Sequence, residues 1–162
     1  MNAEMEGVVG RRIDLFGPTV EFLSAPSEAE AFCALRGTIP QGAFVPLHSH
    51  PDDEDFYIVS GEILALRQGA QGYESTVCRP GDHVRLPGGV RHGFRNVSSG
   101  PSVSLVVTTA TLGRFFLEMG RPLEQASLPP TPEDFVRRVS VAAKYGYWLA
   151  SPEENAAVGI RL

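Results

Sequence analysis

The sequence has little of what nucleic-acid-binding, secreted or membrane-spanning proteins need. Lys144 is the only lysine, the arginines are scattered, and the net charge is −5, so no basic stripe is present for nucleic acid. The two cysteines, Cys33 and Cys78, are far apart and lack metal-ligand spacing, which favours free thiols in a reducing compartment. The first twenty residues contain no apolar signal-peptide core, and no apolar run approaches membrane-spanning length. We therefore expect a cytoplasmic protein without nucleic-acid or membrane partners.

Turn-forming residues are abundant: the chain has 17 glycines and 13 prolines. Between them lie short β-branched and aromatic runs, which predict strands at 19–24, 32–39, 43–50, 54–60, 62–68, 73–78, 83–86, 92–96 and 103–111. Many short strands separated by such turns indicate an all-β sandwich or barrel. We predict one domain, with an N-terminal arm over 1–18, a β-barrel over 19–111 and a helical extension over 112–162 that packs on the barrel.

The extension carries helix signals. Residues 113–120 predict a short helix that Gly120 ends, and Thr131 followed by Pro132 predicts the start of a longer one that ends at Gly146. A further turn is expected from Ser151. Apolar residues recur at helical spacing in the longer helix, and we expect this face to pack on the barrel or on a second subunit: Phe135, Val136, Val139, Ala142 and Ala143. Tyr147 and Trp148 are assigned to helix–barrel packing.

The stretch HSHPDDEDFYIVSG (48–61) joins two histidines to four consecutive acids. His48 and His50 share one face of a strand, where two imidazoles can bind one ion. Pro51 then breaks the strand, and we expect Asp52 and Asp53 to be turn acids that face water. Parity on the next strand separates Glu54 from Asp55 but does not decide which acid is the ligand, because both strand faces are apolar.

A third histidine, His92, lies in a short predicted strand 42 residues after His50. Imidazoles with a carboxylate and no thiolate suit one divalent transition-metal ion, of which Fe, Mn and Ni are favoured and Zn, Cu and Co are possible. A structural zinc site would favour cysteine ligands.

These residues resemble the two motifs of the cupin superfamily. The first motif, G-x5-H-x-H-x3-E-x6-G, matches residues 42–61, and the second, G-x5-P-x-G-x2-H-x3-N, matches residues 81–96. Every motif position is filled: Gly42, His48, His50, Glu54, Gly61, Gly81, Pro87, Gly89, His92 and Asn96.

The resemblance implies a jelly-roll β-barrel, the double-stranded β-helix, with metal ligands His48, His50, Glu54 and His92. In some members of the family, the carboxylate at the position of Glu54 also helps to move protons. We expect Asn96 to have a structural role or to support a metal ligand. Segments outside the motifs resemble small bacterial cupins described as quercetin-dioxygenase-like. Such cupins commonly form homodimers through an N-terminal strand, and we expect a homodimer here.

The metal pocket is expected to be largely apolar, because several apolar residues share strand faces with the ligands: Phe44, Pro46, Phe56, Ile58 and Phe94. Leu105 and Val107, or the residues that alternate with them, are expected to add a further wall. Such a lining suits a small organic substrate, although the same residues could simply fill the barrel. Arg85, Arg91 and Arg95 occupy alternate strand positions that are expected to face outward.

Three functions follow from this site. The first is a metal-dependent oxygenase acting on a small, possibly aromatic or diketone-like compound. The second is a non-oxidative isomerase, epimerase or cyclase, and the third is a non-enzymatic small-molecule-binding module. The fold does not choose among them, because this barrel carries many chemistries.

Overall fold

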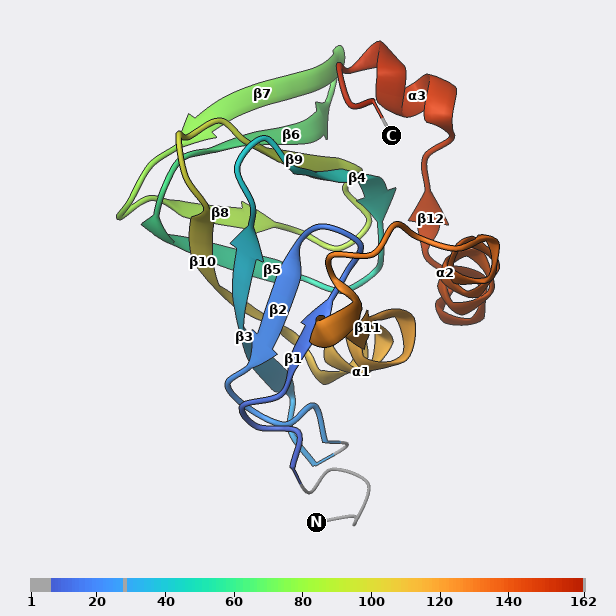
Figure 1. Cartoon of the computed structure of the whole chain (residues 1–162). Coiled ribbons are helices and arrows are strands. Elements are labelled where there is room, and N and C mark those ends of the chain that lie inside the picture. The colour runs from blue at the N-terminus through green and yellow to red at the C-terminus, as the bar shows by residue number, and fades with distance from the viewer. Residues whose placement is uncertain (1–6, 28, 162) are drawn as a thin grey trace.

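The computed structural model describes residues 7–27 and 29–161, so the first six residues of the predicted arm lie outside it. Within this part, antiparallel strands form two sheets (Figure 1). The strands are β1 (Arg12–Asp14), β2 (Thr19–Phe22), β3 (Phe32–Ile39), β4 (Phe44–Ser49), β5 (Glu54–Ser60), β6 (Ile63–Gly69), β7 (Gly72–Cys78), β8 (His83–Leu86), β9 (His92–Asn96), β10 (Ser102–Thr109), β11 (Arg121–Pro122) and β12 (Trp148–Leu149).

The larger sheet has the order β11-β1-β2-β3-β10-β5-β8, and the smaller has the order β12-β4-β9-β6-β7. Sequence-distant strands are thus neighbours, as β3 and β10 are, and the two sheets together form the barrel. The predicted fold class, an all-β jelly roll with a helical C-terminal extension, is confirmed. The short strands β1, β11 and β12 were not predicted, because two or three residues carry too little pattern.

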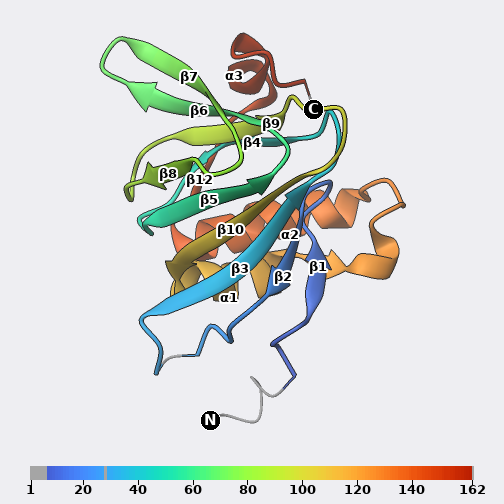
Figure 2. The same ribbon diagram turned by 90° about the vertical axis from the view of Figure 1, so that its left-hand side faces the viewer.

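Within residues 110–161, three α-helices follow the barrel strands: α1 (Ala110–Met119), α2 (Pro132–Tyr145) and α3 (Pro152–Ala157), with a 3₁₀ turn at Leu123–Gln125. α1 lies beside the N-terminal strands and packs against α2, which also contacts β12, whereas α3 lies near the smaller sheet (Figures 1 and 2). α2 begins as predicted: Thr131 caps it in a reciprocal pair with Asp134, and Gly146 ends it in the left-handed conformation at φ 71°. No helix in the described part of the chain is long and apolar enough to cross a bilayer.

The apolar interior divides into clusters that hold these layers together. Phe22, Leu35 and Val106 belong to the cluster near the N-terminal strands, and Phe94 belongs to the barrel cluster. Of the helix face predicted to pack, Ala142 is buried with its neighbour Val141 against Phe115 and Tyr147 of a third cluster. Phe135, Val136 and Val139 are exposed in this chain, so they do not pack on the barrel. The free thiols of Cys33 and Cys78 are both buried.

Candidate metal centre

The four residues predicted as ligands come from both sheets. His48 lies near the end of β4 and His92 begins β9, and the two are register partners in the smaller sheet. His50 follows β4 directly, and Glu54 begins β5 of the larger sheet. The turn between β4 and β5 therefore brings the carboxylate across to face the three imidazoles.

The ligand atoms converge. One nitrogen or oxygen atom from each of His48, His50, Glu54 and His92 lies within 4.8 Å of the corresponding atoms of the other three. Glu54 Oε2 lies 3.2 Å from His50 Nε2 and 3.2 Å from His92 Nε2. His50, Glu54 and His92 are at most 4% exposed and are shielded from bulk water, whereas His48 is half-buried.

The second nitrogen of each imidazole fixes its orientation. Nδ1 of His48, His50 and His92 lies 2.8, 3.0 and 2.8 Å from the main-chain carbonyl of Pro46, Asp52 and Val90. A carbonyl only accepts, so each Nδ1 donates a proton and each Nε2 keeps its lone pair for a ligand. Nε2 of His92 is buried and has no hydrogen-bond partner despite its closeness to Glu54. Three aimed Nε2 atoms and a carboxylate fit a divalent transition-metal ion.

The protonation states also suit metal binding. Burial, together with the neighbouring His92 and His50, lowers the pKa of His48 to about 3, so that this imidazole is neutral at pH 7. Burial disfavours the charged form of Glu54, but its interactions with His50 and His92 outweigh that effect and lower its pKa. Burial likewise opposes charge on His50, yet Glu54 and Asp52 raise its pKa, so a proton competes for its Nε2.

The four consecutive acids at 52–55 separate in space. Asp53 pairs with Arg85 at 2.9 Å on the surface, and Asp55 faces outward to His83 at 2.7 Å. Asp52 was predicted to face water, and this is wrong: it is 6% exposed and accepts hydrogen bonds from Thr109 and Tyr147. Neither Asp52 nor Tyr147 was predicted to support the site, because their contact joins residues 95 positions apart in the sequence.

The strand that carries His48 is irregular, and this changes which residues face the ligands. Val45 pairs with Phe94 and His48 pairs with His92, so three steps on β4 match two on β9. This bulge reverses the alternation between the two positions. Val45 therefore shares the interior with His48, whereas Phe44 packs in the cluster beneath α3. The prediction that Phe44 and Pro46 line the pocket, which assumed unbroken alternation, is wrong.

A cavity of about 100 Å³ reaches His48 and Glu54 from the barrel interior. Phe56 and Phe94 border it, as predicted, and so does Val106. Ile58 is buried in the barrel core but does not border it.

Leu105 and Val107, predicted to line the pocket, face outward and are each 37% exposed. The inward positions of β10 are instead Ser102, Ser104, Val106 and Thr108. Small polar residues are accepted inside because some meet polar partners there, as Thr108 does in donating to the Asp53 carbonyl at 2.8 Å.

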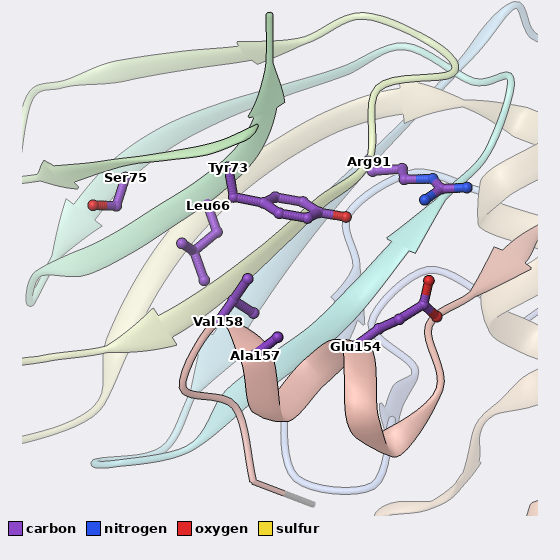
Figure 3. Close-up of a pocket in the computed structure, with 7 residues that line it drawn as sticks. All are labelled: Leu66, Tyr73, Ser75, Arg91, Glu154, Ala157 and Val158. Carbon is purple, nitrogen blue, oxygen red and sulfur yellow. The ribbon is translucent and has the colours of Figure 1, made fainter. Parts of the chain in front are cut away.

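A second hollow, of about 490 Å³, lies between α3 and the strands β6 and β7 (Figure 3). Arg91 lines it and stacks on Trp148 at 3.9 Å, which agrees with the outer-face parity predicted for this arginine. None of the four candidate ligands borders this hollow.

Comparison with known proteins agrees with the geometry. Residues 35–108 match the family model for the cupin domain. The chain is 32% identical over 82 residues to dimethylsulfoniopropionate lyase DddQ of Ruegeria pomeroyi, a match that covers 51% of this chain and only 39% of that relative.

Among solved structures, the chain resembles the Cnp3 cupin domain of Schizosaccharomyces pombe, with a TM-score of 0.50 and 17% identity over 57% of this chain and 64% of that one. It also resembles the polyketide cyclase RemF of Streptomyces resistomycificus, with a TM-score of 0.51 and 23% identity over 57% of this chain and 65% of that one. At these identities the structural likenesses establish the fold alone.

Proposed function

This chain belongs to the cupin superfamily, and from that premise we propose that it is a metal-dependent enzyme that acts on a small organic molecule in the barrel cavity. The observation that carries the proposal is the convergence of three oriented Nε2 atoms and the Glu54 carboxylate within 4.8 Å, beside a cavity that reaches His48 and Glu54. Iron, manganese or nickel suits this donor set best, and zinc, copper or cobalt is the alternative.

The residues of this chain would bind the metal ion and transfer protons. His48, His50, His92 and Glu54 would hold the ion, and a six-coordinate ion bound by four protein groups keeps about two positions for substrate or co-substrate. When bound, the ion supplies Lewis-acid activation of a substrate oxygen and, if it is redox-active, electrons for reaction with O₂. Glu54 borders the cavity, so it is also the group placed to accept or return a substrate proton.

The cavity restricts the substrate. Its volume of about 100 Å³ is below the roughly 300–1,000 Å³ typical of ligand pockets, which favours a compact substrate over a flavonol. Phe56, Phe94 and Val106 would exclude water from the reacting groups. The first candidate reaction is oxygenation of such a compact substrate, because an apolar chamber beside two open positions suits both the substrate and O₂.

A non-oxidative reaction is the second candidate, and the sequence relative named as a dimethylsulfoniopropionate lyase favours it. Elimination, isomerisation and cyclisation all use Lewis-acid activation together with a base, and Glu54 could serve as that base. The same residues would act without O₂.

Oxygen dependence separates the two reactions. Protein purified without chelator or affinity nickel is analysed for metal, and turnover of small catechols, β-diketones and dimethylsulfoniopropionate is followed with and without O₂. Oxygen consumption that requires substrate supports the oxygenase, whereas turnover that persists without O₂ supports the second candidate. A metal-bound protein that turns over no compound and only binds small molecules would contradict the enzyme proposal.

A further inference from the structure

We propose that Asp52 and Tyr147 act as a positioning pair that fixes His50 for metal binding, so that the C-terminal segment completes the metal centre. This inference rests on the proposed metal site and adds two residues to it that are not ligands.

Asp52 connects the ligand turn to two other parts of the chain. Its main-chain carbonyl accepts the Nδ1 proton of His50 at 3.0 Å, which sets the plane of that imidazole. One carboxylate oxygen accepts a hydrogen bond from Thr109, and the other accepts one from Tyr147. The side-chain hydrogen bonds of Asp52 therefore fix the position of its own main-chain carbonyl, which in turn orients His50.

Burial of this carboxylate needs an explanation beyond packing. An ionisable group in the interior is costly unless its oxygens are hydrogen-bonded, and an apolar side chain would fill the same space at lower cost. Asp52 is 6% exposed, and a hydroxyl donor is supplied to each of its oxygens. Such an arrangement gives one fixed position to the turn at residues 50–53, which is what a metal ligand within it requires.

Tyr147 is itself firmly placed. Gly146 turns the chain at the end of α2, and the Tyr147 amide donates to the carbonyl of Ala142 at 2.8 Å. The ring is 8% exposed and lies between those of His50 and Phe115, with centroid distances of 5.4 and 4.6 Å. The Tyr147 hydroxyl thus approaches Asp52 from a fixed support.

The residues after Tyr147 reinforce this arrangement. β12 pairs with β4 so that Trp148 is opposite Ser49 and Leu149 is opposite His48. The C-terminal segment therefore extends the sheet alongside the ligands and also supplies a hydroxyl to the turn. These two contacts are independent, and together they join residues 147–149 to the metal centre.

The test compares Tyr147→Phe with Tyr145→Phe in the full chain. Both substitutions remove one tyrosine hydroxyl from the same segment, but the Tyr145 hydroxyl donates to Glu118 at 3.1 Å on the surface, away from the ligands. Affinity for Co²⁺ is measured by chelator competition, the Co²⁺ absorption spectrum reports ligand geometry, and thermal unfolding of the metal-free proteins reports stability.

We expect Tyr147→Phe to weaken Co²⁺ binding about tenfold and to change the spectrum, whereas Tyr145→Phe changes neither. Asp52→Asn, which keeps the shape of the side chain, should weaken Co²⁺ binding at least as much. The double variant Asp52→Asn/Tyr147→Phe should bind Co²⁺ no more weakly than Asp52→Asn alone, because the two residues act together. If Co²⁺ binds the wild type and Tyr147→Phe equally, with the same spectrum, the positioning role is overturned while the metal site stands. If the wild type binds no metal ion, the proposed function fails and this inference fails with it.

Discussion

Replacing Glu54 with alanine removes the carboxylate from the four candidate ligands and leaves the three imidazoles in place. Glu54 is 3% exposed, and its Oε2 atom lies 3.2 Å from Nε2 of both His50 and His92. The substitution takes away one metal ligand and the negative charge that would offset the charge of a divalent ion. We therefore expect metal affinity to fall steeply while the barrel persists.

The size of the loss follows from what the carboxylate does. Residues that only orient metal ligands contribute about 10–100-fold to affinity, so removal of a ligand should cost at least about 100-fold. That loss corresponds to about 2.8 kcal/mol of binding free energy. In the metal-free protein the change also removes the charged partner of His50, so the pKa of His50 should fall.

The adjacent acid provides the matched control. Asp53 pairs with Arg85 at 2.9 Å and accepts a hydrogen bond from the Gly88 amide at 2.8 Å, with a largely exposed side chain. Asp53→Ala should therefore cost about 0–1 kcal/mol of stability for its surface ion pair and leave metal affinity unchanged. Chelator competition on both variants measures the difference. Equal losses for Asp53→Ala and Glu54→Ala, or wild-type affinity in Glu54→Ala, would refute the ligand assignment.

Three further outcomes are expected. The pKa of His50 is raised, and a proton competes with the metal for the same Nε2 atom. The apparent metal affinity should therefore be full above that pKa and fall about tenfold per pH unit below it. A flat profile in a pH series of metal titrations would contradict this. Gly88→Ala would place Cβ in steric conflict with the Pro51 carbonyl oxygen. It should therefore destabilise the protein by about 1–3 kcal/mol in urea denaturation and weaken metal binding. Val106→Phe should fill the cavity and abolish turnover while the metal is retained. Val107→Phe, on the outer face, should change neither turnover nor metal content. Equal turnover in the two variants would contradict the cavity assignment.

Much of the fold could be predicted because local signals and the global pattern agree. Alternation and turn residues located the strands from β2 to β10 within one or two residues, and capping residues located α2 and α3. The strands that were missed are very short and pair with distant partners, as β11 does with β1. Their existence depends on tertiary contacts that local sequence does not encode.

The candidate site was predictable only to the extent that motif spacing located it. The four ligand positions follow from the two motifs, and the structure brings them together. The cavity lining was less predictable for two reasons. A bulge in β4 places Val45, and not Phe44, on the inner face, and the inward positions of β10 include serine and threonine. Burial of Asp52 could not be foreseen, since its partner Tyr147 lies 95 residues away and an acid in a turn ordinarily faces water.

The metal site is tested most directly by the metal content of the wild-type protein. The protein is purified without chelator or affinity nickel and measured by mass spectrometry beside a His48→Ala/His92→Ala variant. We expect one divalent transition-metal ion per wild-type chain and none in the variant, with both proteins folded by circular dichroism. A wild-type protein without metal that also fails to take up added Fe²⁺, Mn²⁺ or Ni²⁺ would contradict this expectation.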